Sequence, residues 1–286
     1  SSLEPIAELA REHGIVLTPH LTTAMPRDGR RPNEQDILMA GIHNLGFLAL
    51  GKGEAADTLL DWWEERLEHD CLVDPSRGFF VDQRWMDFIP GLVPGTHLLR
   101  DPGYNVAYWN LHGRALSQPQ PGEYRVNGQP LRFMHFSGYD PRRPDVLSKH
   151  QNRIELDDPV LRELADAYGR RLLDAGYEDT ITWPYGYGVS ASGLPLTRVL
   201  RRAHAAAVVE GELSREPFEP QGEEEFFAWL AAPSAVGGDH GITRYMYAVY
   251  SDREDLQRAY PDVANGDAAG MIGWFQVEAP GHLATP

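Results

Sequence analysis

Apolar residues recur with two different spacings along this chain, and the change between them limits the folds open to it. Up to about residue 150 the apolar runs are short and bounded by turn-forming residues, as in 15–20 and 44–51. From about residue 155 apolar residues recur every three or four positions, which predicts helices. The helical stretches are 157–174, 194–209, 223–231, 241–260 and 266–276. We therefore expect an α/β protein, with a mixed-sheet part over 1–153 and a mostly helical part over 154–286 packed on it.

Local patterns predict individual elements within this frame. Residues 3–12 have the spacing of an amphipathic helix. Residues 54–69 form the clearest helix, with one apolar stripe made of Ala56, Leu60, Trp63 and Leu67. The dipeptide at 127–128, Asn-Gly between strand-like flanks, predicts a β-hairpin. The aromatic stretch WPYGYG at 183–188 is expected to form a packed loop.

The charge balance bears on the partners of the protein. The 286 residues include 42 acidic and 26 basic ones, which gives a formal net charge of −16. Nucleic-acid binding requires clustered Lys and Arg that neutralise phosphates, and no basic stripe occurs. We therefore expect no nucleic-acid partner. Lys52 and Lys149 are the only lysines, and this preference for Arg is typical of high-GC bacterial genomes.

Cysteine usage and hydropathy bear on the location. The single cysteine, Cys71, cannot form an internal disulfide, which favours a reducing compartment. No run of about 18 apolar residues and no charged-then-apolar leader occurs, so we expect neither a transmembrane segment nor a signal peptide. A cytoplasmic location is the expectation, with the inner face of the membrane as an alternative.

The first of three polar clusters lies in AGIHNLGFLAL, residues 40–50. Asn44 and Gly46 lie at the start of an apolar strand, where the amide side chain and the glycine backbone are able to contact a ligand. The alternative is structural: Asn44 forms a turn, and Gly46 permits close packing of the strand.

The second cluster lies in FFVDQRW, residues 79–85. Asp82 and Gln83 follow an apolar run, so a carboxylate and an amide emerge where a buried strand ends. Ligands gather at strand ends in α/β sheets. The alternative is that Asp82 caps a short helix, because Asp at that position accepts hydrogen bonds from free backbone N–H groups.

The third cluster begins in LRFMHFSGYD, residues 131–140, which starts like an interior strand and stops at Ser137-Gly138. His135 lies near its end, and Lys149 follows shortly after. An imidazole is able to bind a divalent metal, whereas Lys and backbone N–H groups bind phosphate. The alternative is that His135 is a hydrogen-bonded core residue.

Two weaker candidates lie outside these clusters. In NVAYWN, residues 105–110, the side chains of Tyr108, Trp109 and Asn110 combine aromatic rings with an amide, which suits a sugar ring. Core aromatics are the alternative. His20 follows the predicted strand at 15–20, and there we favour a structural role over a ligand.

Several well-known catalytic motifs do not occur in the sequence. It contains no GxGxxG string, no P-loop, no HExxH, no CxxC pair and no GxSxG elbow. The chemistry of the chain therefore has to be inferred from the three clusters.

The order of the motifs along the chain resembles bacterial GT-A-type glycosyltransferases, distantly those of the glycogenin and lipopolysaccharide-galactosyltransferase kind. The matching segments are LTPHLTTAMPRDGRRPNEQDIL, GIHNLGFLAL, GFFVDQRWMDFIPGL, DPGYNVAYWNLHGR, FMHFSGYDP, LSKHQNR and, near the end, GITRYMYAVYSDREDLQRAYPDV. The resemblance implies a GT-A-like mixed sheet over residues 1–153. It also implies a nucleotide-diphosphate sugar as donor and a glycan, lipid-linked or cell-wall acceptor.

The resemblance assigns roles position by position. Asp82 and Gln83 match an Asp-Gln pair beside the reacting sugar and become the catalytic candidates. His135 matches a metal-ligating histidine, which implies Mn2+ or Mg2+ as cofactor. Together with the clusters, it makes the substrate-binding candidates Asn44, Gly46, Tyr108, Trp109, Asn110, Ser137, Gly138 and Lys149.

The chain departs from the family pattern at its start. In the family, a metal-binding D-x-D ends a strand just before a helix like SSLEPIAELA, and this chain begins at that helix. We therefore expect a missing N-terminal half, or further transferase domains, elsewhere in the intact protein. The leading hypothesis is a metal-dependent sugar transferase. The first alternative is a non-catalytic carbohydrate-binding or scaffolding module, and the last is a glycoside hydrolase that uses Asp82 and Asp87.

Overall fold

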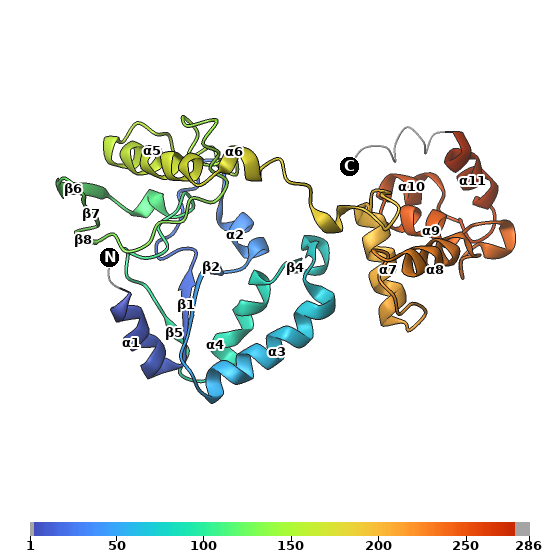
Figure 1. Cartoon of the computed structure of the whole chain (residues 1–286), viewed down its shortest axis with the longest axis horizontal. Coiled ribbons are helices and arrows are strands. Elements are labelled where there is room, and N and C mark those ends of the chain that lie inside the picture. Colours follow the sequence, from blue (N-terminus) through green and yellow to red (C-terminus); the bar gives the residue numbers. More distant parts are fainter. Residues whose placement is uncertain (1–2, 278–286) are drawn as a thin grey trace. The chain divides into compact units, whose positions relative to one another are not determined.

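The computed structural model describes residues 3–277 and has α/β architecture, with small sheets and many helices. The chain divides into two compact units, Ser1–Ile181 and Thr182–Pro286 (Figure 1). The predicted boundary after residue 153 lies inside the first unit, before helix α5 (Pro159–Asp174).

The main sheet of the first unit has three strands and mixed directions. Strand β1 (Ile15–Pro19) pairs antiparallel with β2 (His43–Leu50) on one side and parallel with β5 (His97–Leu98) on the other. The first two strands confirm the predicted runs at 15–20 and 44–51, and the sheet is mixed as expected. The β1–β2 register shifts between Leu17 and Thr18, which places an irregularity next to the start of β2.

Strand β1 is buried on both faces. Alternate side chains of a strand point in opposite directions, and those of β1 are covered on either side. Ile15 and Leu17 pack toward α3 (Glu54–Asp70) and α4 (Ile89–Leu92), whereas Val16 packs under α1 (Glu4–His13) (Figure 1). All three side chains are fully buried. This core fixes the position of the β1–β2 edge that carries Asn44.

The structure corrects the predicted apolar stripe of α3. Ala56 is buried as expected, but Leu59 is fully buried and Leu60 is 44% exposed. The face of the helix that packs on the core is therefore rotated from the predicted one. Trp62 and Trp63 also pack against this core from partly buried positions.

Two smaller sheets complete the first unit. Strands β3 (Val73–Asp74) and β4 (Phe79–Phe80) pair with each other, and β6 (Leu116–Gln120), β7 (Glu123–Val126) and β8 (Gln129–Pro130) form an antiparallel meander. The predicted hairpin turn joins β7 to β8, with φ of 50° at Asn127 and 82° at Gly128. Left-handed backbone at both central residues is what a two-residue hairpin turn requires.

The predicted interior strand at 131–136 is not a strand. Only Met134 forms a β-bridge, with Val106, and the backbone N–H of His135 donates to the carbonyl of Val106 at 2.8 Å. The segment is extended and lies beside residues 103–106 without a regular ladder. The remaining helical segments of this unit are α2 (Glu34–Ala40), α6 (Tyr177–Thr180) and the short 3₁₀ turns η1 (Pro75–Arg77), η2 (Gln83–Phe88) and η3 (Leu111–Gly113).

The second unit is mostly helical, as predicted. Its helices are α7 (Arg198–Val209), α8 (Pro220–Ala231), α9 (Arg244–Ser251), α10 (Glu254–Ala259) and α11 (Ala268–Val277), with 3₁₀ turns η4 (Gly186–Gly188) and η5 (Gly238–His240). The predicted helix at 241–260 is broken into α9 and α10. The core of the unit includes the fully buried Phe226, Ile242 and Met271.

The stretch at 183–188 does not form the packed loop that was predicted. Trp183, Tyr185 and Tyr187 are 71%, 69% and 59% exposed. Across residues 3–277, no helix combines the length and the apolar character needed to cross a bilayer.

Candidate functional site

A pocket of about 560 Å³ in the first unit gathers most of the predicted site residues. Its volume is in the range of small-molecule sites. The predicted residues in its lining are Asn44, Gly46, Asp82, Gln83, Tyr108, Trp109, His135 and Ser137. They come from four separate segments, so the fold brings together clusters that are far apart in the sequence.

Asn44 and Gln83 are bonded directly to each other. The Nδ2 of Asn44 donates to the Oε1 of Gln83 at 3.0 Å, and the N–H of Leu45 donates to the same oxygen at 3.1 Å. The Nε2 of Gln83 donates to the carbonyl of Ala40 at 2.9 Å. The amide of Gln83 is therefore committed to holding the end of α2 and the start of β2, and its role in the pocket is positional.

Asn44 is held from its other side as well. Its Oδ1 accepts the N–H of Gly46 at 3.0 Å, and its Nδ2 lies 3.2 Å from the Nε2 of His20. The hydroxyl of Thr18 donates to its carbonyl at 3.2 Å. Asn44 is 5% exposed, so these bonds satisfy a buried amide at the irregular part of the β1–β2 pairing.

Gly46 and His135 are in close contact. A Cβ built on Gly46 would lie 1.9 Å from the Nδ1 of His135 and 2.3 Å from its Cε1. No side chain fits there unless the imidazole moves. Gly46 therefore permits close packing, which was the structural alternative for this residue. The side chain packed on it is that of His135, another predicted site residue.

His135 is half-buried and borders the pocket. Burial lowers the pKa of its imidazole, which favours the neutral form. Its ring meets that of Trp109 edge to face, with centroids 5.2 Å apart. Its Nδ1 has no hydrogen-bond partner and lies against Gly46, which leaves Nε2 as the nitrogen available to a ligand.

His20 forms the inner wall of the pocket. Burial lowers the pKa of His20 to about 4, so its imidazole is neutral near pH 7. Because the amide N–H of Asn44 donates to Nε2, we assign the proton to Nδ1. His20 and His135 both meet the ring of Trp109 edge to face, at 5.3 and 5.2 Å between centroids. Trp109 is 4% exposed and lies between the two imidazoles at the pocket wall.

The carboxylate of Asp82 is not a helix cap. Asp82 occupies the N-cap position of η2, yet its side chain accepts no capping hydrogen bond. Its backbone carbonyl accepts the Nε1–H of Trp63 at 3.2 Å. The preceding residue, Val81, has φ of 43°, a left-handed conformation that is strained for a β-branched residue. A strained turn therefore presents the carboxylate to the pocket lining.

Asp87 is committed to structure. Its Oδ1 accepts the N–H of Ile42 at 2.9 Å, and its Oδ2 forms a short ion pair with Arg84. Asp87 is not in the pocket lining. Asp82 and Asp87 therefore do not form the pair of carboxylates around one ligand that the glycoside-hydrolase alternative named.

Three predicted binding residues lie outside the lining. Asn110 is 2% exposed, and its amide bonds the backbone of Ala107, His20 and Asn105. Gly138 has φ of 74°, and a Cβ there would lie 2.5 Å from the ring of His150. Lys149 is exposed and donates its backbone N–H to the carbonyl of Gly138 at 3.0 Å. The first is a structural residue, and the other two shape the turn that carries His150 to the pocket.

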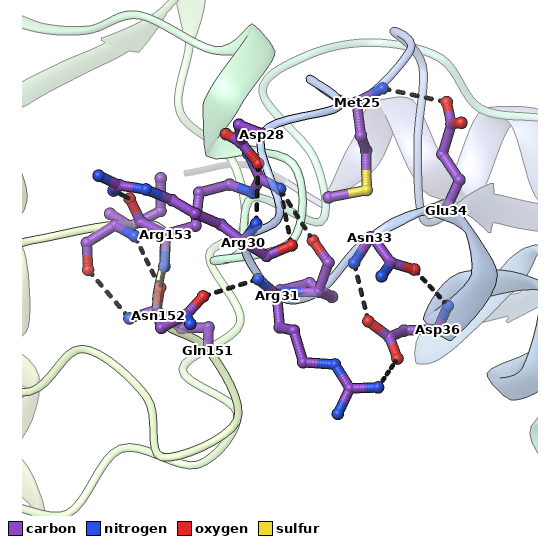
Figure 2. A network of polar contacts seen from close by, with 12 residues as sticks. Met25, Asp28, Arg30, Arg31, Asn33, Glu34, Asp36, Gln151, Asn152 and Arg153 are labelled. Carbon is purple, nitrogen blue, oxygen red and sulfur yellow. Dashed lines mark hydrogen bonds and ion pairs between the residues drawn. The ribbon is translucent and has the colours of Figure 1, made fainter.

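Arg31 and Asp36 also line the pocket, although no motif in the sequence had indicated either of them. Arg31 comes from the turn-rich loop before α2 and Asp36 from the first turn of that helix, and Nη2 of Arg31 lies 2.9 Å from Oδ1 of Asp36 (Figure 2). Asn33 and Asp36 also form a capping box at the start of α2. The string NEQD was a signal for that helix start, but no pattern showed that the preceding Arg31 reaches the pocket.

Arg153 ties this loop to a distant segment (Figure 2). Its guanidinium forms an ion pair of 2.5 Å with Asp28 and donates to the carbonyls of Arg30 and Pro32 at 3.2 Å each. The neighbouring Asn152 accepts the N–H of Arg31 through its Oδ1 at 2.6 Å. The edge of the pocket that carries Arg31 is therefore held by residues from the 150s.

The described residues do not by themselves form a divalent metal site. Within 3–277, no group of three or more His, Cys, Asp or Glu side chains is arranged to hold a metal ion. His135 offers one nitrogen, whereas Mg2+ and Mn2+ need several oxygen or nitrogen ligands. No step of a reaction is therefore assigned to a metal held by these residues alone.

Two curated relatives align with part of the chain. YfnF, an uncharacterized protein of Bacillus subtilis (strain 168), is 30% identical over 126 residues, which are 44% of this chain and 42% of that protein. YfnD, an uncharacterized protein of the same organism, is 32% identical over 102 residues, which are 35% of this chain and 32% of that protein. The chain spans less than half the length of each of these relatives. No known family profile and no solved structure matches it.

Proposed function

We propose that this chain is a glycosyltransferase of the GT-A type, or the transferase-derived part of one. It would move a sugar from a nucleotide-diphosphate donor to a glycan, lipid-linked or cell-wall acceptor. A cytoplasmic location, including the inner face of the membrane, and further transferase domains belong to the same proposal. The observation that carries it is the uncapped carboxylate of Asp82, placed by a strained turn in a pocket with aromatic and imidazole walls.

Asp82 is the proposed catalytic residue. Sugar transfer develops positive charge at the anomeric carbon, and a carboxylate beside that carbon stabilises the charge. The side chain of Asp82 has no capping bond, so it is available for this role. Gln83 contributes through position, because its amide holds Asn44 and the start of β2 in place.

The aromatic wall provides the place for the sugar ring. Tyr108 and Trp109 lie next to each other in the lining, with ring centroids 4.9 Å apart. The C–H faces of a sugar pack on such rings, while its hydroxyls need polar partners. Ser137 and His135, which also line the pocket, would supply those partners.

Arg31 takes the place that the resemblance gave to Lys149. The guanidinium of Arg31 lines the pocket, and it is 68% exposed. A guanidinium binds phosphate oxygens through two parallel hydrogen bonds. The diphosphate of the donor is therefore expected at the Arg31 edge. If Mn2+ or Mg2+ takes part, His135 would supply one ligand to it, with other ligands from the donor or from outside the described residues, and the cation would offset charge on the diphosphate.

The alternative function is carbohydrate binding without transfer. One observation favours it: Tyr108 and Trp109 in the lining suit a sugar ring whether or not a transfer follows. In that case the aromatic wall would still bind a glycan, and Asp82 would accept a hydrogen bond from a sugar hydroxyl. The two functions differ in turnover and share sugar binding.

The experiment that tests the proposal measures donor hydrolysis and binding with UDP- and GDP-sugars in the presence of Mn2+. We expect Asp82→Asn to lower turnover by at least about a hundredfold while donor binding changes little. The matched control is Asp61→Asn on the exposed face of α3, which should keep full activity.

His135→Ala is the companion variant, with His69→Ala on α3 as its control. Donor affinity should fall for the first and stay unchanged for the second. Equal turnover and binding in wild type, Asp82→Asn and His135→Ala would overturn the site. Sugar binding without any turnover in the wild type would instead favour the carbohydrate-binding module.

A further inference from the structure

A second cavity of about 460 Å³ lies in the first unit, where η3 and β6 meet the start of α5. It shares no lining residue with the pocket of Asp82. Its basic side chains are Arg30, Arg114 and Arg153. Three arginines around one cavity are notable in a chain with a formal net charge of −16.

Arg114 is a buried cation that forms no close ion pair, although the Asp101 carboxylate lies near enough to partly offset the effect of burial on its pKa. It is 8% exposed, and none of the ion pairs found among residues 3–277 includes it. Its Nη1 donates to the carbonyl of Tyr104 at 2.8 Å, and its Nε has no hydrogen-bond partner. Burial lowers the pKa of Arg114 to about 10, so the side chain is still charged near pH 7. A buried charge of this kind is costly to folding unless an anion compensates it.

Arg153 shows what a compensated guanidinium looks like in the same cavity. It is equally buried, but it has the carboxylate of Asp28 and two backbone carbonyls as partners (Figure 2). Arg30 donates through Nη1 to the carbonyl of Arg153 at 3.1 Å, which holds the Arg30 chain at the cavity. The protein therefore gives Arg153 an ion pair and two carbonyl partners, whereas Arg114 has one carbonyl partner and no close ion pair.

The lining also carries three carboxylates, Glu155, Asp157 and Asp158, and no ion pair joins any of them to Arg114 among residues 3–277. The Oδ1 of Asp158 accepts the N–H groups of Val160 and Leu161 at the start of α5, at 2.8 and 3.1 Å. Glu155 and Asp157 are exposed, so water and salt screen their charge. Such a lining disfavours a long polyanion and accepts a single compact one.

We propose that this cavity binds the phosphate group of a small ligand, with Arg114 as the buried partner and Arg30 as the exposed one. A guanidinium matches the geometry of a phosphate through paired hydrogen bonds. This site is independent of the proposed sugar transfer, because its residues lie outside the pocket of Asp82.

Inorganic phosphate is the probe, added to the full chain and compared with chloride at the same ionic strength. Anything that binds only the folded state raises the melting temperature with its concentration. At about ten times its dissociation constant, phosphate should raise the melting temperature by about 3 °C. ³¹P NMR line broadening measures the same binding directly.

Arg114→Met is the decisive variant. It removes the uncompensated charge while keeping an apolar chain, so the variant should be at least as stable as wild type in chloride and should lose the phosphate shift. Arg143→Met, on an exposed arginine outside the cavity, is the charge-matched control and should keep the shift.

Further variants keep the test decisive if Arg114→Met does not fold. Arg114→Lys retains the charge and Arg30→Gln alters only an exposed side chain, and each should weaken phosphate binding by about tenfold. An unchanged phosphate shift in both variants would overturn the proposal, and so would a wild-type protein with no shift. Acetate should have little effect. An equal shift with acetate would overturn the assignment to phosphate.

Discussion

The Asn44–Gln83 wall and the Val81–Asp82 turn border the same pocket, and they are built in opposite ways. In the wall, the Asn44 and Gln83 amides are bonded to each other and to the backbone around them. In the turn, the backbone is strained at Val81 and the carboxylate of Asp82 caps nothing. Side chains that are fully hydrogen-bonded within the protein keep a site in shape. Side chains without such bonds are the ones available to a ligand.

The largest expected effect on stability is at Gly46, which ties the wall to His135. Gly46→Ala places a methyl group 1.9 Å from the Nδ1 of His135, so the imidazole or β2 has to move. We expect a loss of about 3 kcal/mol in the free energy of unfolding, measured by urea denaturation. Gly91→Ala is the control, because a Cβ there has nothing within 4 Å. Equal stability of both variants would contradict the close packing.

The loss of folding stability at acidic pH tests the role of His20, which lies beside Asn44 in the wall. Its pKa is lowered from 6.5 to about 4 in the folded protein, so the unfolded state binds more protons between these values. Stability is therefore fully present above pH 6.5 and is lost as the pH falls toward 4. At pH 5 the loss should be about 2 kcal/mol relative to pH 7. His20→Gln should remove this part of the slope, and an unchanged slope would refute the role of His20.

Gln83→Met tests whether Gln83 is structural. The change leaves the Nδ2 of Asn44 and the N–H of Leu45 short of an acceptor, which should cost about 1.5 kcal/mol of stability. Gln35→Met, at an exposed position of α2, should be neutral. Thermal or urea unfolding measures both. If Gln83→Met folded as stably as wild type and lost only turnover, Gln83 would belong with Asp82.

Asp82→Asn should have the smallest effect on stability, within about 0.5 kcal/mol, because no capping bond is lost. Its effect should appear in turnover instead. A stability loss above about 1 kcal/mol would place Asp82 among the structural residues and erase the difference between the turn and the wall. The same unfolding experiment as for Gln83→Met provides the comparison.

The elements that depend on neighbouring residues could be predicted from the sequence. The strands near 15–20 and 44–51 and the turn at Asn127 follow from local preferences, and the structure confirms them. The strand at 131–136 could not be judged locally, because a strand requires a continuous partner. Residues 103–106 offer only one β-bridge, at Met134.

The gathering of the site residues was predicted better than the task of each one. The resemblance implied that Asn44, Asp82 and His135 surround one ligand, and the three residues do line one pocket. Whether Gly46 faced a ligand or an imidazole depends on how two distant segments cross, which no local pattern contains. The choice of Arg31 over Lys149 as the pocket cation depends in the same way on the path of a loop.

The ion pair between Asp28 and Arg153 also bears on the order in which the pocket assembles. The two residues are 125 positions apart, so the chain has to close a long loop before this contact forms. Contacts between near neighbours, such as the capping box of α2, are able to form first. The Arg31 edge should therefore be completed late in folding, after the β1–β2 wall, so substitution of Arg153 should speed unfolding more than it slows folding.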